Sequence, residues 1–470
     1  MRARGLSLLR EAEEIARGIT DAWERSEALE DVVEAMALYD VAEAERVAWS
    51  APEKDRTRAL LRVVEGAVGH DLDGAERIAR AMPAGRDQVR ALGRVACRLG
   101  PQESARALRL LEEARRIADA LRDDEERADA LYEVAKALAR HTPGDAVEIA
   151  RSITDPVDRR LALRDVAEAM AEKDPGAAER IARDLTGGTD EETRREVLQR
   201  VAEVVAEHDA AQAERLANAI EGRSKRSWAL ERVVYRVARH DPVEAERIAR
   251  TIPCQSHQIG ALRSVMDVWA EHDIAEAERI AGSIPGDDPK RRVWRVVLLQ
   301  ARHDPAEAER QARTLLTGSI QVSAFHHIAE ALLDRDRPWA VRLLAEAERL
   351  AHGLSRPYRR MEQLQEIALI VAACDPAEAE RIVGGIEDRE GRDHALRALA
   401  EKTAVYDPPE AERLARTVED PRLRSQTLQE VAFEAARHRH VDQAERIARG
   451  ITEHPEWKVR ALVWVARALL

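Results

Sequence analysis

A phrase of seven residues, Glu-Ala-Glu-Arg-Ile-Ala-Arg, recurs throughout this chain of 470 residues. It stands in full at residues 244–250, and degenerate copies precede and follow it. The first alanine of the phrase marks one position in each of fourteen copies: Ala12, Ala44, Ala75, Ala114, Ala146, Ala178, Ala213, Ala245, Ala277, Ala308, Ala347, Ala379, Ala411 and Ala444. Most copies are 31–33 residues apart, a period that indicates a solenoid of stacked repeats and not one globular core.

Each repeat divides into two helices. In the copy at Ala245, small or apolar residues stand at the alanine and three, four and seven places later, ending at Ile252. This spacing is the stripe of an amphipathic helix. A break at Pro253 separates it from a longer apolar-periodic segment that ends near His272. Because the marked position is alanine in all fourteen copies, we expect two helix backbones to approach closely there, where a larger side chain would push them apart.

The start of each first helix carries a capping signal. A carboxylate just before a helix accepts hydrogen bonds from the free amides of the first turn. Thr142, before Pro143, is interpreted as a variant of this cap. Glu one place after the marked alanine and Arg two places after it occur in twelve repeats each, and they predict surface or inter-repeat ion pairs. Aspartate stands four places before the alanine in nine repeats: Asp40, Asp71, Asp174, Asp209, Asp241, Asp273, Asp304, Asp375 and Asp407.

Two repeats, the fourth and the eleventh, are seven residues longer than most. Their first helices are predicted to be extended at the N-terminal end, over segments that begin at Arg106 and Trp339. These two repeats lie seven repeats apart, and the same series of spacings surrounds both. The sequence therefore predicts a duplicated array of seven repeats, with halves 1–237 and 238–470 joined in one continuous solenoid.

The phrase Asp-Pro-x-Glu-Ala-Glu-Arg-Ile-Ala-Arg-x-Ile resembles the degenerate helical repeats of actinobacterial regulatory proteins, and the helix pair resembles tetratricopeptide-like solenoids. The resemblance implies an all-α, right-handed superhelical solenoid of fourteen antiparallel helix pairs. It also implies that the first helices line the concave face. The tetratricopeptide signature of Trp, Leu-Gly, Tyr and Phe at fixed offsets is absent, so the peptide-carboxylate clamp of that family is not expected.

Composition and motifs narrow the function classes. The net charge of −13 disfavours general nucleic-acid binding, because phosphate contacts need a basic surface. We find no phosphate-binding loop, nucleophile motif or metal-ligand spacing, and therefore expect no enzyme, cofactor or metal. No apolar run reaches the length of a membrane span. Three cysteines without paired spacing fit a reducing compartment, so we expect a cytoplasmic protein.

One position five places after the marked alanine varies in chemical type while its neighbours do not. Arginine there can recognise carboxylate or phosphate groups, and a large aromatic side chain can anchor a partner. In seven of the eight repeats with arginine, glutamate stands four residues earlier, which also fits a simple surface pair. We take these members of the column as candidate partner-binding residues: Trp49, Arg80, Arg151, Arg183, Arg250, Arg313, His352 and Arg416.

The favoured function is a non-catalytic scaffold that binds a protein or peptide partner, one with acidic groups if the arginine column is used. Such a scaffold fits a sensor or adaptor region of a signalling or regulatory system. One alternative is an oligomerising solenoid that associates through uncapped ends, because the apolar last helix carries no polar cap. Another is an enzyme whose site lies in the superhelix groove, which needs carboxylates or histidines brought together from different helices.

Overall fold

The structure is a computed structural model that describes residues 1–171, 174–184, 190–285 and 289–470. Within these ranges the side chains of residues 101, 183, 184, 190, 193, 289 and 292 are not described. The described residues form 28 α-helices and one short 3-10 helix, η1 (Pro101–Glu103), with no strand among them. The predicted all-α solenoid of tandem helix pairs is confirmed.

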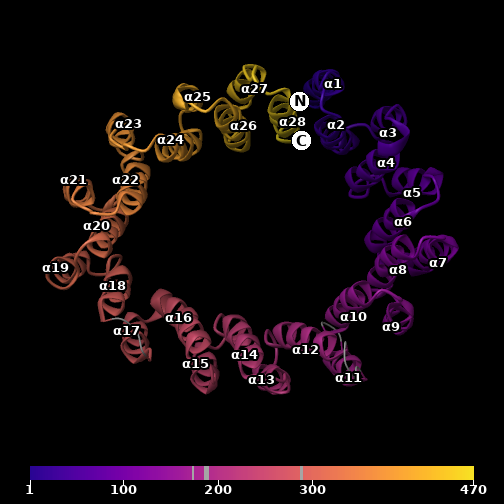
Figure 1. Cartoon of the computed structure of the whole chain (residues 1–470), viewed down its shortest axis with the longest axis horizontal. Coiled ribbons are helices and arrows are strands. Elements are labelled where there is room, and N and C mark those ends of the chain that lie inside the picture. Colours follow the sequence, from indigo (N-terminus) through magenta and orange to yellow (C-terminus); the bar gives the residue numbers. More distant parts are fainter. Residues whose placement is uncertain (172–173, 185–189, 286–288) are drawn as a thin grey trace. The chain divides into compact units, whose positions relative to one another are not determined.

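Every repeat contributes one odd-numbered and one even-numbered helix (Figure 1). The first helices are α1 (Arg2–Arg17), α3 (Val41–Trp49), α5 (Leu72–Ala81), α7 (Ser104–Ala120), α9 (Pro143–Ser152), α11 (Pro175–Asp184), α13 (Ala210–Asn218), α15 (Pro242–Thr251), α17 (Ile274–Ser283), α19 (Pro305–Leu315), α21 (Arg337–His352), α23 (Pro376–Gly384), α25 (Pro408–Thr417) and α27 (Val441–Arg449). The second helices are α2 (Ala22–Ala37), α4 (Glu53–Ala67), α6 (Arg86–Arg98), α8 (Asp124–Leu138), α10 (Pro156–Ala171), α12 (Asp190–Val205), α14 (Arg223–Val237), α16 (Gln255–His272), α18 (Pro289–Gln300), α20 (Ser319–Leu332), α22 (Pro357–Val371), α24 (Arg389–Thr403), α26 (Pro421–Arg437) and α28 (Pro455–Arg467).

Within each unit the core lies between the first helices and the second helices on which they pack. All fourteen marked alanines are fully buried, and so is the small residue four places later in each first helix. In the eighth repeat, for example, Ala245, Ile248 and Ala249 of α15 are buried together with Leu262 and Val265 of α16. α15 packs directly on α16, so the apolar stripe read from the sequence is the buried one.

The aspartate caps form as predicted. The side chains of all nine aspartates, and that of Asp336 in the long eleventh repeat, accept a hydrogen bond from a backbone amide of the first helical turn. The prediction for Thr142 is wrong: its hydroxyl makes no capping bond and is buried without a partner. The first-turn amides of α9 therefore lack the side-chain acceptor that the other caps provide.

Removing one cap should cost a measurable part of the stability. Asp241 accepts from the amide of Glu244 at 2.9 Å. We expect Asp241→Ala to lower the free energy of unfolding by about 1 kcal/mol, because a first-turn amide loses its acceptor, and Asp241→Asn to lower it less. Urea unfolding followed by circular dichroism measures both. An alanine variant as stable as the unaltered chain would contradict the capping role.

The chain forms two compact units. Unit 1 comprises Met1–Ala35 and Gly286–Leu470, and unit 2 comprises Met36–Pro285. These boundaries do not coincide with the halves 1–237 and 238–470 expected from the spacing of the long repeats. A duplication concerns ancestry and the units concern contacts, so the duplication stays a prediction.

Within each unit the second helices stack directly on one another from repeat to repeat, as α10, α12, α14 and α16 do in unit 2. Direct contact between consecutive first helices is much sparser. In Figure 1 the second helices accordingly follow the inner side of each unit, and the first helices follow the outer side. The expectation that first helices line the concave face is therefore wrong: the closely packed row must lie on the inside of a curved stack.

The two ends of the chain meet in unit 1, where α1 packs against α28. α1 has 16 residues, like the extended α7 and α21 with 17 and 16, whereas the other first helices have 9 to 11. α7 packs on α6, and α21 on α20, in the same way. The first repeat is thus a third long repeat, and its additional turns lie against the last repeat.

Ion pairs at this joint repeat those of an internal joint. Arg4 binds Asp442 and Glu445, both at 2.6 Å, as Arg106 of the fourth repeat binds Asp73 and Glu76 of the third at 2.5 and 2.6 Å. Arg449 also binds Glu11 at 3.0 Å. Arg460 and Arg467 of α28 bind Glu27 and Glu34 of α2 at 2.9 and 3.0 Å. The expectation of uncapped ends is wrong, because each end covers the other.

Removing α1 should create the exposed end that the intact chain lacks. We expect deletion of residues 1–20 to uncover the apolar side of α28 and to cause concentration-dependent association. The full chain should keep the mass of one chain. Size-exclusion chromatography with light scattering measures both. A deletion variant that stays monomeric, or a full chain that associates as strongly, would contradict this view of the joint.

Among the described helices, none combines the length with the apolar character that a bilayer crossing requires.

Candidate functional site

The candidate residues chosen from the sequence lie at the ends of first helices, on the outer side of each unit. Arg80 binds Glu76 at 2.5 Å, Arg250 binds Glu246 at 2.6 Å and Arg416 binds Glu412 at 2.9 Å. Each of these glutamates stands four residues earlier in the same helix. The surface-pair interpretation of the column is therefore confirmed at these positions, and the concave recognition stripe is not formed.

The other candidates are also dispersed along the outer side. Arg313 binds Glu309 and Glu346 at 2.7 and 2.6 Å, and His352 lies 3.6 Å from Glu348. Trp49 is 37% exposed, with the guanidinium of Arg56 at 5.9 Å from its ring centre. Arg151 is exposed at the end of α9, and the side chain of Arg183 lies outside the described residues. No two of the described candidates share a cavity among the pockets found.

Further ion pairs connect consecutive first helices. Arg two places after the marked alanine binds the glutamate one place after the alanine of the preceding repeat, as predicted. Arg279 binds Glu246 in this way at 2.5 Å, and Arg413 binds Glu380 at 2.5 Å. The same relation joins Arg77 to Glu45, Arg247 to Glu214, Arg381 to Glu348 and Arg446 to Glu412. Many charged side chains on the first helices are thus paired with one another.

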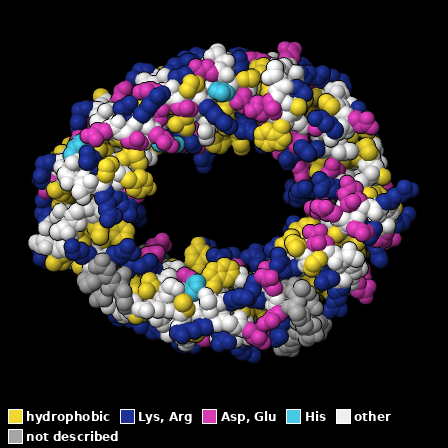
Figure 2. All heavy atoms as spheres, in the orientation of Figure 1, with side chains coloured by type: hydrophobic (Ala, Val, Ile, Leu, Met, Phe, Trp, Pro, Cys, Tyr) yellow, Lys and Arg dark blue, Asp and Glu magenta, His cyan; other side chains and the backbone are white. Residues whose placement is uncertain are grey.

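A groove opens on the inner side of unit 2, over the second helices α10, α12, α14 and α16. It encloses about 840 Å³. Its charged lining is mixed but has more cations than anions, with Arg164, Arg195, Arg200, Lys225 and Arg232 against Glu168, Glu196 and Glu203. Trp228 and His257 complete the side that α14 and α16 contribute. In this part of the molecule, hydrophobic and basic side chains lie next to each other along the inner rim (Figure 2).

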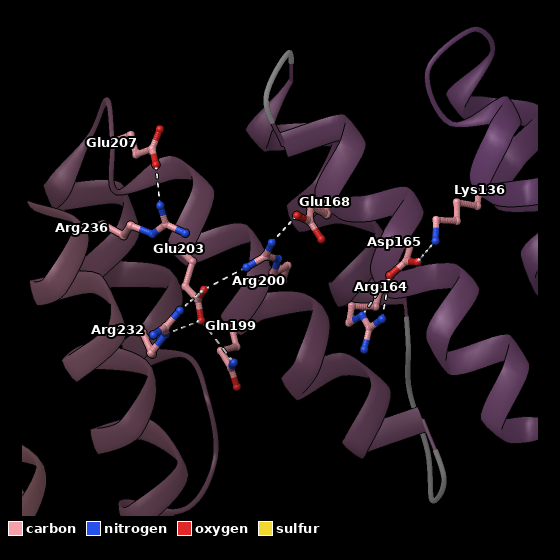
Figure 3. A network of polar contacts seen from close by, with 10 residues as sticks. All are labelled: Lys136, Arg164, Asp165, Glu168, Gln199, Arg200, Glu203, Glu207, Arg232 and Arg236. Atoms are coloured by element: carbon pink, nitrogen blue, oxygen red, sulfur yellow. Dashed lines mark hydrogen bonds and ion pairs between the residues drawn. The ribbon is translucent and has the colours of Figure 1, made fainter. Parts of the chain in front are cut away.

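A network of polar contacts crosses the floor of the groove from helix to helix (Figure 3). Arg200 of α12 binds Glu168 of α10 and, at 3.1 Å, Glu203 of its own helix. Arg232 of α14 donates twice to Glu203, at 3.3 Å each. Glu203 is only 3% exposed, so its charge needs both guanidinium groups. The network positions α10, α12 and α14 and leaves these groups little freedom to react.

A separate set of polar contacts joins α10 to α8 at Asp165 (Figure 3). The Tyr132 hydroxyl donates to Asp165 at 2.8 Å, and Lys136 lies 3.7 Å from the same carboxylate. Burial and the adjacent Asp165 raise the pKa of the Tyr132 hydroxyl. Arg164 also donates to Asp165, at 2.8 Å. Tyr132 is therefore held as a hydrogen-bond donor, a structural role and not a nucleophilic one.

One face of α14 carries two aromatic side chains that are largely exposed. Trp228 and Tyr235, two turns apart, are 41% and 42% exposed. The guanidinium of Arg239, just beyond the helix, lies 4.9 Å from the Tyr235 ring centre and donates to its hydroxyl at 2.8 Å. Lys225 interacts with Glu192 at longer range and helps to lower the pKa of that carboxylate, whereas Arg239 is held by the Tyr235 ring and hydroxyl. Exposed aromatic rings between such cations form a surface that can hold another molecule.

This face of α14 was not predicted from the sequence, because the prediction followed the phrase that repeats in the first helices. The second helices share little beyond their apolar stripe, so their surface positions cannot be aligned from repeat to repeat. A local signal is nevertheless present: α14 carries five basic residues and one acidic residue, with Trp228 and Tyr235 seven places apart.

Within the residues that the structure describes, no group of three or more His, Cys, Asp or Glu side chains is placed to hold a metal ion.

A pair of carboxylates in unit 1 is the arrangement that most resembles an acid–base site. Arg397 of α24 donates to Glu401 at 2.8 Å and to Glu430 of α26 at 2.8 and 2.7 Å. Burial, and then the neighbouring Glu401, raise the pKa of Glu430 to about 8. Burial alone would raise the pKa of Glu401, but hydrogen bonds from Glu430 and Arg397 lower it. The two carboxyl groups share one proton, and both already accept hydrogen bonds from the Arg397 guanidinium. This arrangement is typical of a structural pair and not of an acid–base site.

The shared proton predicts a pH dependence of stability. The pKa of Glu430 is higher in the folded chain than the ordinary 4.5, so the stabilisation is complete below about pH 4.5 and is lost as the pH rises toward 8. We expect the melting temperature of the unaltered chain to fall more across this range than that of Glu430→Gln, which cannot ionise. The exposed Glu390→Gln is the matched control. Equal slopes for all three chains would contradict the shared proton.

Comparisons with known proteins add little to these observations. No family model matches the chain, and no curated protein matches it. A number of solved structures are similar to the chain, among them the following two. The crystal structure of Ton1535 from Thermococcus onnurineus NA1 is 15% identical over 79% of this chain and 98% of that one, with a TM-score of 0.26. A circular tandem repeat protein with novel repeat topology and enhanced subunit contact surfaces is 16% identical over 99% of both chains, with a TM-score of 0.16. The fold class rests on the chain's own helices.

Proposed function

We propose that this protein is a non-catalytic scaffold that binds a partner protein on the inner face of unit 2, at the groove over α10 to α16. The observation that carries the proposal is the face of α14, where Trp228 and Tyr235 are exposed beside Lys225 and Arg239. Large exposed aromatic side chains beside a groove are typical of binding hot spots.

The groove supports binding better than catalysis. Its central charges are joined in a network that ties three helices together, and the buried Glu203 is held by two arginines. A catalytic carboxylate or base must be free to exchange a proton with substrate. Oligomerisation through the chain ends is less favoured, because α1 already covers α28.

In its wider role, the scaffold fits a sensor or adaptor region of a signalling or regulatory system in the cytoplasm. The repeats resemble tetratricopeptide-like units in length and in the pairing of their helices. The partner would lie along second helices, where the resemblance implies first helices.

Partner capture with paired variants tests the proposal. A protein captured by the tagged chain from the source cell is purified, and its affinity is measured by isothermal titration calorimetry. We expect Trp228→Ala combined with Lys225→Glu to weaken binding at least about tenfold, as loss of an aromatic anchor does. The outer-face control, Trp49→Ala combined with Arg250→Ala, should change it less than about twofold. If the outer-face variant loses the partner and the groove variant keeps it, the proposal is wrong.

A further inference from the structure

The charge of α14 is opposite to that of the chain. The helix carries Arg223, Lys225, Arg226, Arg232 and Arg236 against the single acid Glu231, in a chain whose net charge is −13. Two of these arginines are neutralised, Arg232 by Glu203 of α12 and Arg236 by Glu207 just beyond the end of α12. Arg223 and Arg226 donate to the backbone carbonyls of Pro253 and Ile220. A local excess of positive charge therefore remains on the inner side of unit 2.

The excess lies at the unfavourable end of the helix. The first turn of α14 contains no acidic residue, although the N-terminus of a helix carries a partial positive charge of its own. Arg223, Lys225 and Arg226 add to this charge, and Glu192 balances only part of it through its interaction with Lys225. An anionic group bound here would relieve both repulsions at once.

Aromatic and basic side chains alternate along one face of the helix. Lys225, Trp228, Arg232, Tyr235 and Arg239 follow one another at three- and four-residue steps, which keeps them on one side. At 1.5 Å per residue the row is about 20 Å long. An extended peptide advances about 3.3 Å per residue, so roughly six residues of a partner would cover it.

The groove carries both positive and negative side chains, and this mixture favours one class of anionic ligand. Glu168, Glu196 and Glu203 stand in the same groove as the basic residues, and they would repel a strand that carries a phosphate at every step. A peptide can place carboxylates only opposite the cations and an apolar side chain opposite the rings. The groove thus complements a chain of interrupted charge, which favours a peptide over a nucleic acid.

We infer that the inner face of α14 binds an extended acidic peptide segment of a partner protein. Its carboxylates pair with Lys225 and Arg239, and an apolar side chain between them packs on Trp228 and Tyr235. This inference rests on the proposed scaffold function and adds the chemical class of the partner.

Fluorescence anisotropy with labelled probes tests the inference on the full chain. The first probe is a peptide of about eight residues with a central Leu-Phe flanked by glutamates, and the second has lysine in place of each glutamate. The third is single-stranded DNA of similar length. We expect the acidic peptide to bind at least about tenfold more tightly than the lysine peptide and the DNA, and to weaken as salt is added.

Variants locate the site. Trp228→Ala and Lys225→Glu should each weaken the acidic peptide by about three- to tenfold. The matched controls Trp23→Ala and Lys54→Glu change an exposed residue of the same type elsewhere and should leave binding unchanged. Circular dichroism of each variant confirms that it is folded.

Three results would overturn the inference: equal binding of the acidic and lysine peptides, tighter binding of the DNA, or binding that survives both α14 variants. A natural partner that is lost with Trp228→Ala, while the acidic probe shows no preference, would overturn the acidic class and leave the scaffold function standing. If the α14 variants lose neither the natural partner nor the acidic probe, both the acidic class and the proposed binding site would be wrong.

Discussion

The buried alanine of each first helix, where the helix backbone can approach the neighbouring second helices closely, is the constraint on which the structure depends. All fourteen of these alanines are inaccessible to solvent. Because the side chain at this position is only a methyl group, a first helix can lie directly on the second helices beside it, as α15 does on α14 and α16. The aspartate caps then determine where each first helix begins, so the pair is repeated with little variation along the chain.

The two rows of helices carry out different tasks. Charges on the first helices pair with each other within and between repeats, as the ion pairs of Arg279 and Arg413 with the preceding repeats show. The second helices stack more closely and differ more in surface chemistry. In unit 2 they bring cations, glutamates and exposed rings from α10 to α16 to one groove. The repeating row supports the structure, and the variable row carries the surface that we propose for recognition.

Much of the fold could be predicted from the sequence, because the period, the apolar stripe and the capping aspartates are local signals. The face that curves inward could not be predicted in this way, since it depends on which row packs more closely across repeats. The contact of α1 with α28 could have been predicted, because the sequence marks α1 as a long first helix. Leu-Leu-x-Glu-Ala at residues 8–12 recurs at 110–114 and at 343–347, before the marked alanines of the three long first helices. The groove combines residues from four helices without a shared pattern, so its lining became visible only with the helices in place.

The central claim is that second helices of unit 2, and not the arginine column on the first helices, form the binding surface. Hydrogen–deuterium exchange of the chain, with and without a bound partner, tests this claim most directly, because backbone amides report protection along each helix separately. The account predicts slower exchange in residues 223–239 on binding, with no change in the neighbouring first helix at 242–251. Protection confined to the first helices would contradict it.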